Sequence, residues 1–103
     1  MTYRIVETEG LAGFSPNGVR PIPLLDTDKV RALLLNLEAG QSVAPCRMSS
    51  TVLYYVIEGQ GQLQVEEEQA QLRTGSLTMV PAGAERFISA VQPMRVLAIQ
   101  ALT

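Results

Sequence analysis

The chain contains no histidine and no tryptophan, and Cys46 is the only cysteine among its 103 residues. Without histidine, Cys46 and the α-amino group are the groups expected to titrate near neutral pH, and no imidazole is available to relay protons. With a single cysteine, no disulfide can form within the chain. The composition therefore argues against a histidine-based catalytic site and against a fold that depends on disulfides.

Long apolar runs and clustered positive charge are also missing. No apolar run approaches the roughly 18 residues of a membrane span, and the N-terminus has no apolar signal core. The net charge is −2 and the eight basic residues are scattered, so neither a nucleic-acid stripe nor a polybasic membrane patch is present. We interpret the acidic run Glu66–Glu68 as a solvated hairpin tip. A soluble cytoplasmic protein that binds neither nucleic acid nor membranes is expected.

The length predicts one domain over residues 1–103. We expect an N-terminal strand and loop segment over 1–25 and a barrel core over 26–103. A chain of this size can bury roughly 60 to 68% of its unfolded surface, which allows a real core without covalent staples.

Short stretches with period-2 alternation, separated by turn residues, run along the whole chain. They predict an all-β protein, because no segment shows a helical period. Arg20–Pro23 contains two prolines and can lie only at a sheet edge or outside a sheet. The expected strands or extended segments are Tyr3–Val6, Val30–Leu37, Val43–Met48, Val52–Ile57, Gln62–Val65, Gln69–Leu72, Leu77–Val80, Glu85–Ser89 and Met94–Ala101.

Two of these strands are apolar on both faces, which predicts that both faces are covered. One barrel interior cannot bury both faces, so the N-terminal segment or a second subunit must cover the other. The residues expected to need this cover are Leu33, Leu35, Leu53, Tyr55 and Ile57. Exposed together, they would exceed the few hundred Å² that monomers usually leave bare, which favours a homodimer.

Two stretches, Gly40–Gly59 and Gly75–Ala90, carry glycine and proline at fixed spacings. Their spacing resembles the two sequence motifs of the cupin family. The five framework positions that match are Gly40, Gly59, Gly75, Pro81 and Gly83. The resemblance implies a jelly-roll β-barrel of two antiparallel sheets.

The residues that would bind metal in the resemblance are replaced here. Cys46, Met48, Val52 and Arg86 stand where the family has its metal-binding histidines and glutamate, and Ala90 stands at the usual asparagine. The resemblance thus implies a barrel without the usual metal site or cofactor. Two sulfur atoms, on Cys46 and Met48, offer a weak alternative as ligands of Cu(I). We favour the interpretation that both side chains fill the core.

The same register directs six side chains into the barrel. They provide a thiol, a thioether, a phenol and a guanidinium on apolar walls, as small-molecule sites do. The candidate ligand-binding residues are Cys46, Met48, Val52, Tyr54, Arg86 and Ile88. Arg86 is the most informative, because an unpaired buried charge costs several kcal/mol. It either reaches the barrel mouth, pairs with Glu58 or Glu85, or holds an anionic ligand.

Three functions follow from this pocket. The leading hypothesis is a metal-free binding module for a small, partly apolar, anionic molecule, with Arg86 as its anchor in an open pocket. The second is an enzyme, either a metal-independent isomerase or lyase, or an oxygenase-like protein with copper at Cys46 and Met48. The third is a structural domain with a collapsed interior. The sequence does not decide which residues, if any, are catalytic.

Overall fold

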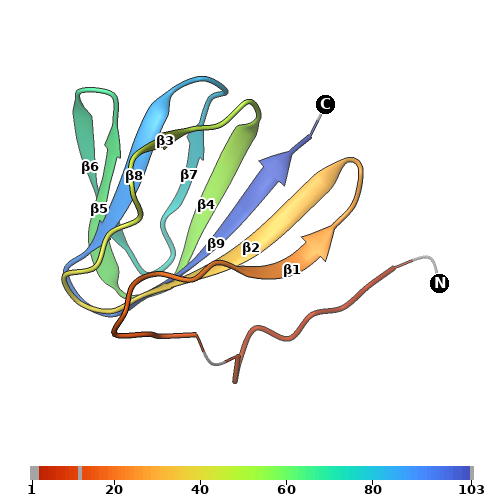
Figure 1. Cartoon of the computed structure of the whole chain (residues 1–103), viewed down its shortest axis with the longest axis horizontal. Helices are drawn as coiled ribbons and strands as arrows, with labels where there is room; N and C mark the ends of the chain where they lie inside the picture. The colour runs from red at the N-terminus through yellow and green to blue at the C-terminus, as the bar shows by residue number, and fades with distance from the viewer. Residues whose placement is uncertain (1–2, 12, 103) are drawn as a thin grey trace.

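The computed structural model describes residues 3–11 and 13–102, and this part of the chain folds into nine strands without a helix (Figure 1). No helix here is therefore long and apolar enough to cross a membrane. The strands are β1 (Ile22–Asp26), β2 (Val30–Leu37), β3 (Cys46–Arg47), β4 (Thr51–Glu58), β5 (Gln60–Val65), β6 (Glu68–Arg73), β7 (Leu77–Val80), β8 (Glu85–Ala90) and β9 (Met94–Ala101).

The strands form two antiparallel sheets. The five-stranded sheet has the order β1-β2-β9-β4-β7, and the four-stranded sheet has the order β3-β8-β5-β6. The chain crosses from one sheet to the other several times, as in a jelly roll. This confirms the predicted all-β class and its two antiparallel sheets, although no strand pairing described here closes them into a full barrel.

The core lies between the two sheets and follows the alternation of the strands. On β4, Val52, Tyr54 and Val56 are buried, whereas Leu53 and Tyr55 on the other face are exposed. On β2, Leu35 and Leu37 belong to the core and Leu33 packs against it. The expectation that Leu33 and Leu35 need a second cover is therefore wrong. Leu35 is buried in the interior and Leu33 is partly buried against it, because the two share the inward face of their strand.

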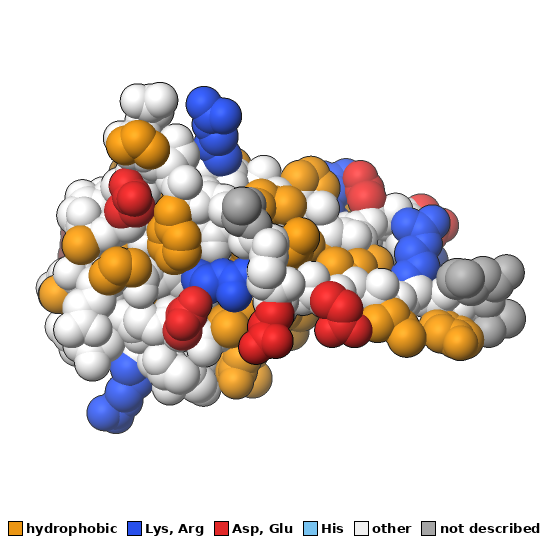
Figure 2. All heavy atoms as spheres, turned by 90° about the horizontal axis from the view of Figure 1, so that it is seen from below, with side chains coloured by type: hydrophobic (Ala, Val, Ile, Leu, Met, Phe, Trp, Pro, Cys, Tyr) orange, Lys and Arg blue, Asp and Glu red, His pale blue; other side chains and the backbone are white. Residues whose placement is uncertain are grey.

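The N-terminal segment covers part of the outer face of the five-stranded sheet. Arg95 on β9 donates hydrogen bonds to the Asn36 side chain, 3.2 Å away, and to the carbonyl oxygen of Thr8. A Cβ atom on Gly13 would lie 1.9 Å from the amide nitrogen of Asn36, so a larger residue there would force one of the two to shift. Figure 2 shows the molecule tapering toward the end where this segment extends, with hydrophobic side chains along it.

The glycines of the two motifs occupy turns. Gly40, Gly59, Gly75 and Gly83 all have positive φ angles, which glycine adopts without steric cost. Gly59 has a second constraint, because a Cβ atom there would lie 2.2 Å from the carbonyl oxygen of Pro93. The turn spacing that the sequence shows is thus a backbone requirement of the fold.

The strand predictions differ from the structure at two places. Residues 3–7 form no strand, and Val43–Met48 is reduced to the two-residue strand β3. The proline-containing segment behaves as expected, because β1 lies at a sheet edge. The acidic hairpin also forms as predicted: Glu66 and Glu67 make the tight turn between β5 and β6, and Glu66 has a φ of 52°.

Candidate binding site

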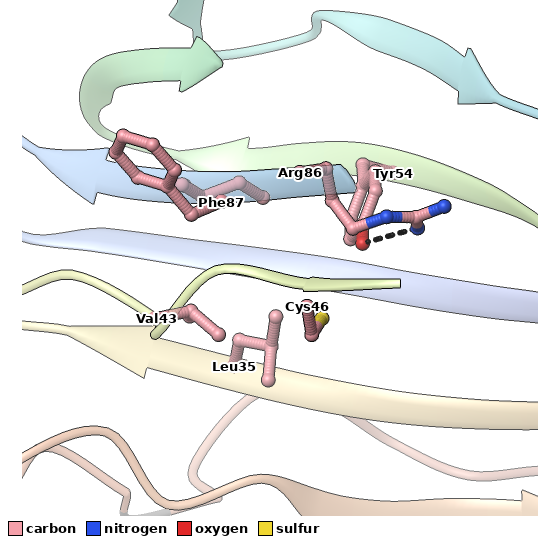
Figure 3. Close-up of a pocket in the computed structure, with 7 residues that line it drawn as sticks. Leu35, Val43, Cys46, Tyr54, Arg86 and Phe87 are labelled. Atoms are coloured by element: carbon pink, nitrogen blue, oxygen red, sulfur yellow. Dashed lines mark hydrogen bonds between the residues drawn. The ribbon is translucent and has the colours of Figure 1, made fainter. Parts of the chain in front are cut away.

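The site is built where the short edge strand β3 meets β8. Cys46 and Arg86 are directly opposite each other in this antiparallel pair, so both side chains leave the sheet on the same face. Tyr54 reaches the same place from β4 in the facing sheet, and its side chain contacts Arg86 (Figure 3). Strand alternation thus brings three of the predicted polar side chains together from three strands.

Arg86 is the largest side chain that is fully buried, with 1% of its surface exposed. Its guanidinium donates three hydrogen bonds: from Nε to the carbonyl oxygen of Ala84 at 3.0 Å, from Nη1 to the hydroxyl of Tyr54 at 3.1 Å, and from Nη2 to the carbonyl oxygen of Pro81 at 3.3 Å. Backbone carbonyl groups of Pro81 and Ala84, just before Arg86 in the chain, therefore hold the guanidinium on one side. Tyr54 holds it from the facing sheet.

None of these three partners carries a negative charge. Glu58 lies 3.9 Å from Arg95 instead, and Glu85 is exposed and forms no salt bridge within the described residues. Arg86 also does not reach the surface. Of the outcomes expected from the sequence, both structural ones are therefore wrong: Arg86 neither reaches the mouth nor pairs with Glu58 or Glu85. The buried cation is solvated by neutral oxygens.

The hydroxyl of Tyr54 remains neutral beside this cation. Burial raises the pKa of the Tyr54 phenol above its ordinary value, and the hydrogen bond and positive charge of Arg86 offset this only in part. A phenol with a raised pKa is protonated at neutral pH. Tyr54 thus orients the guanidinium without neutralising it.

A small cavity of about 20 Å³ lies beside these groups, which is room for about one water molecule. Figure 3 shows Tyr54 and Arg86 on one side of it and Leu35, Val43 and Cys46 on the other. The expected open pocket is therefore much smaller in this conformation. The residues that line it are Leu35, Val43, Cys46, Tyr54, Arg86, Phe87 and Ile88.

Four of the six predicted binding residues line this cavity, namely Cys46, Tyr54, Arg86 and Ile88. Val52 is a core residue with 2% of its surface exposed, and Met48 is partly buried against the core. Neither of these two lines the cavity.

Sequence reasoning missed three lining residues, Leu35, Val43 and Phe87. Leu35 was assigned to the outer face of its strand, although the alternation of β2 places it beside Leu37. Phe87 follows Arg86 on β8, and Figure 3 shows its ring turned away from Tyr54 and Arg86. Cys46 is exposed as well as lining the cavity, because it lies on a two-residue edge strand.

The side chains that line the cavity do not fit the metal site that is usual in the cupin family. The cavity offers a thiol, a phenol and a guanidinium, whereas hard divalent metals and zinc need carboxylate or imidazole ligands. Within residues 3–11 and 13–102, no group of three or more histidine, cysteine or acidic side chains is placed to hold an ion. Of the two sulfur-bearing side chains, Cys46 lines the cavity and Met48 does not.

The comparison with known families agrees with the fold described above. The family described as the cupin domain matches residues 33–100, which includes both glycine-rich stretches and Arg86. The chain belongs to the cupin domain family. No curated protein is similar enough in sequence to match it.

Solved structures resemble this chain over most of its length. The protein TT1209 from Thermus thermophilus is 28% identical, with a TM-score of 0.88 over 95% of this chain and 96% of that chain. A cupin superfamily protein from Desulfitobacterium hafniense is 22% identical, with a TM-score of 0.86 over 97% and 92% of the two chains. KdgF from a Halomonas species is 19% identical, with a TM-score of 0.78 over 86% and 83%. The last two likenesses show the fold alone.

Proposed function

We propose that this cupin domain binds a small, partly apolar anion beside Arg86 and does so without a metal. The observation that carries the proposal is a fully buried guanidinium whose described hydrogen-bond partners are all neutral. A guanidinium has five N–H donors in a planar fork, of which three are used here. A carboxylate or phosphate oxygen supplies the missing negative charge and accepts the remaining donors.

The apolar part of the ligand is expected to lie against Leu35, Val43 and Ile88, which line the cavity beside the arginine. Because the cavity holds about one water molecule, a ligand larger than water needs the wall to open. The wall with the fewest constraints is β3, a two-residue edge strand with an exposed Cys46. Movement of β3 away from β4 and β2 enlarges the cavity at the cost of its two-residue pairing with β8.

A structural domain with a collapsed interior is the second candidate, and the small cavity favours it. In that case Arg86 serves only to tie the Pro81–Gly83 turn to Tyr54. The two candidates differ in one property: only the first makes the stability of the domain depend on added anions.

The lone cysteine and the absence of an intrachain disulfide lead us to propose that the protein is cytoplasmic.

The test is a thermal-shift screen of small carboxylates and phosphates on the wild type, on Arg86→Met and on Arg47→Met. Arg47 is the matched control, since it neighbours the site but is exposed and forms an ion pair with Glu66 at 3.1 Å. We expect an anion to stabilise the wild type and Arg47→Met. Arg86→Met should bind it roughly 10- to 150-fold more weakly, the equivalent of one charged hydrogen bond worth about 1.5 to 3 kcal/mol.

Two results would favour the collapsed domain instead. One is that no anion shifts the melting temperature of the wild type. The other is that Arg86→Met responds as strongly as Arg47→Met, which would mean that any anion binds elsewhere on the surface. Circular dichroism of each variant verifies that the β fold is retained, so that a lost response is not mistaken for unfolding.

A further inference from the structure

The side chain of Cys46 borders both the solvent and the interior of the domain. The residue is exposed on the short edge strand β3, so small solutes can reach it. It also lines the cavity and lies directly opposite Arg86 in the strand register. A cysteine that is exposed and next to a cation is in the kind of environment where thiols are chemically modified.

The buried arginine across the strand pair independently calls for an anion at this place. Arg86 is 1% exposed, and within the described residues it forms no ion pair with an acidic side chain. Its hydrogen bonds to Tyr54, Ala84 and Pro81 use three of the five N–H groups of a guanidinium. A negative charge on the Cys46 side of the cavity would therefore meet an unneutralised cation with donors to spare.

The size of the cavity fits a particular modification. It has a volume of about 20 Å³, which is room for about one water molecule. An oxygen atom bonded to the sulfur of Cys46 needs about the same space, and any further oxygen can point to the solvent because the residue is exposed. An oxidised cysteine thus fits without movement of β3, whereas a larger free ligand needs that wall to open.

We infer that Cys46 is a site of oxidation by hydroperoxides, and that its sulfinate form supplies the negative charge that Arg86 lacks. In the first step the thiol gives up its proton, and the sulfur forms a bond to the terminal oxygen of the hydroperoxide as the O–O bond breaks. The leaving oxygen takes up a proton and departs as water or an alcohol. The sulfur loses two electrons, which the peroxide gains. A second hydroperoxide converts the sulfenic acid to the sulfinic acid in the same way, and this acid ionises at neutral pH.

The lack of a second cysteine favours the second oxidation step. A sulfenic acid commonly condenses with a neighbouring thiol to give a disulfide, which ends the oxidation there. This chain has no other cysteine, so no thiol of its own competes with the second hydroperoxide. The inference rests on the proposed function in that both place an anion beside Arg86. The sulfinate then occupies the donors that a free anion would use, so oxidation closes the site to ligand.

The experiment treats the wild type, Cys46→Ser and Arg86→Met with hydrogen peroxide and follows them by peptide mass spectrometry and thermal unfolding. In the wild type the Cys46 peptide should gain two oxygen atoms, and the melting temperature should rise by about 4 to 8 °C, as for one stabilising contact in a domain of this size. Cys46→Ser reports methionine oxidation alone and should show no rise. Arg86→Met should also show none, because its sulfinate has no cation to pair with.

Two further variants test the charge without an oxidant. Cys46→Asp places a carboxylate where the sulfinate would lie, and Cys46→Asn is its neutral control of matched size. With Arg86 present, Cys46→Asp should melt at a higher temperature than Cys46→Asn. In the Arg86→Met background the difference between the two should disappear, because the carboxylate then has lost the group it pairs with.

Three results would overturn the inference: a Cys46 peptide that does not gain two oxygen atoms, a sulfinate that leaves the wild-type melting temperature unchanged, and an advantage of Cys46→Asp over Cys46→Asn that persists without Arg86. Failure of the proposed function looks different. In that case no added carboxylate or phosphate stabilises the reduced wild type, while Cys46→Asp keeps its advantage. Circular dichroism of each variant verifies that the β fold is retained.

Discussion

Arg86 on β8 and Arg95 on β9 are both buried arginines, and they are solvated in different ways. Arg95 lies on the outer face of the sheet, where it bonds Asn36 and Thr8 and has the carboxylate of Glu58 at 3.9 Å. Arg86 lies in the interior and bonds only a phenol and two backbone carbonyls. The first arginine has a complete structural explanation, because it attaches the N-terminal segment. The second has hydrogen bonds but no neutralising charge.

The comparison shows that burial alone does not reveal whether an arginine stabilises the fold or binds a ligand. A buried cation near a carboxylate and fastened to a remote segment is needed for the fold, and its loss leaves acceptors unsatisfied. A buried cation with neutral partners is retained at a cost in stability, and a ligand that neutralises it offsets that cost. Stability measurements on the two arginines can therefore distinguish a structural role from a binding role.

The largest effect should come from Arg95→Met. The substitution leaves the Asn36 oxygen and the Thr8 carbonyl without their donor, so we expect the free energy of unfolding to fall by about 2 to 4 kcal/mol. Arg86→Met should change it by about 1 kcal/mol or less, in either direction, because removal of an unneutralised buried charge offsets the loss of the hydrogen bonds to Tyr54, Ala84 and Pro81. Urea denaturation followed by circular dichroism measures both values.

Arg31→Met is the control for this pair. Arg31 forms an exposed ion pair with Asp26 at 3.3 Å, and exposed pairs contribute little, about 1 kcal/mol at most. If Arg95→Met were no more costly than Arg31→Met, the link to the N-terminal segment would not contribute to stability. If Arg86→Met were as costly as Arg95→Met, the contrast between the two arginines would be lost.

An intermediate effect is expected from Gly13→Ala. The new methyl group would lie 1.9 Å from the amide nitrogen of Asn36, so either the N-terminal segment or the Asn36 side chain must shift. We expect a loss of about 1 to 3 kcal/mol in the free energy of unfolding, as for other overpacked sites. The same substitution in an Asn36→Ala background should cost clearly less, because the clashing atom is gone. Equal costs in the two backgrounds would place the strain elsewhere.

The smallest effect is a pH dependence that comes from Tyr54. The folded chain holds the phenol proton more tightly than the unfolded chain, since burial raises the pKa of Tyr54. This contribution to stability is fully present below the unfolded pKa of about 10 and is lost as the pH rises through the higher folded pKa. Tyr54→Phe should therefore lose less stability than the wild type above about pH 10.

Tyr55→Phe provides the comparison for that measurement, because Tyr55 is exposed on the opposite face of the same strand. Tyr55→Phe leaves the buried phenol of Tyr54 in place, so its unfolding free energy should keep the pH dependence that Tyr54 contributes. If Tyr54→Phe and Tyr55→Phe gave the same profile between about pH 9 and 11, the buried phenol would not be the group responsible.

Much of the fold could be predicted because it depends on local patterns. The turn glycines need positive φ wherever the chain reverses, and β4 alternates in the way that a half-buried strand must. The face of Leu35 was missed because β2 is apolar on both sides, so the pattern does not say which side is inward. For Arg86, its inward direction followed from register. Its neutral partners did not, because the carbonyl of Pro81 and the hydroxyl of Tyr54 meet it only in the folded chain.

The placement of β9 has a consequence for how the domain forms. It follows the other strands in the chain, yet it lies between β2 and β4 and pairs with both along its length. One backbone edge of β2 and one of β4 therefore stay unpaired until residues 94–101, which form β9, have been made. Such distant pairing is typical of β proteins that fold on the order of milliseconds to seconds. During synthesis, therefore, the chain is most prone to aggregate before β9 completes the five-stranded sheet, because unpaired strand edges can then pair with other chains.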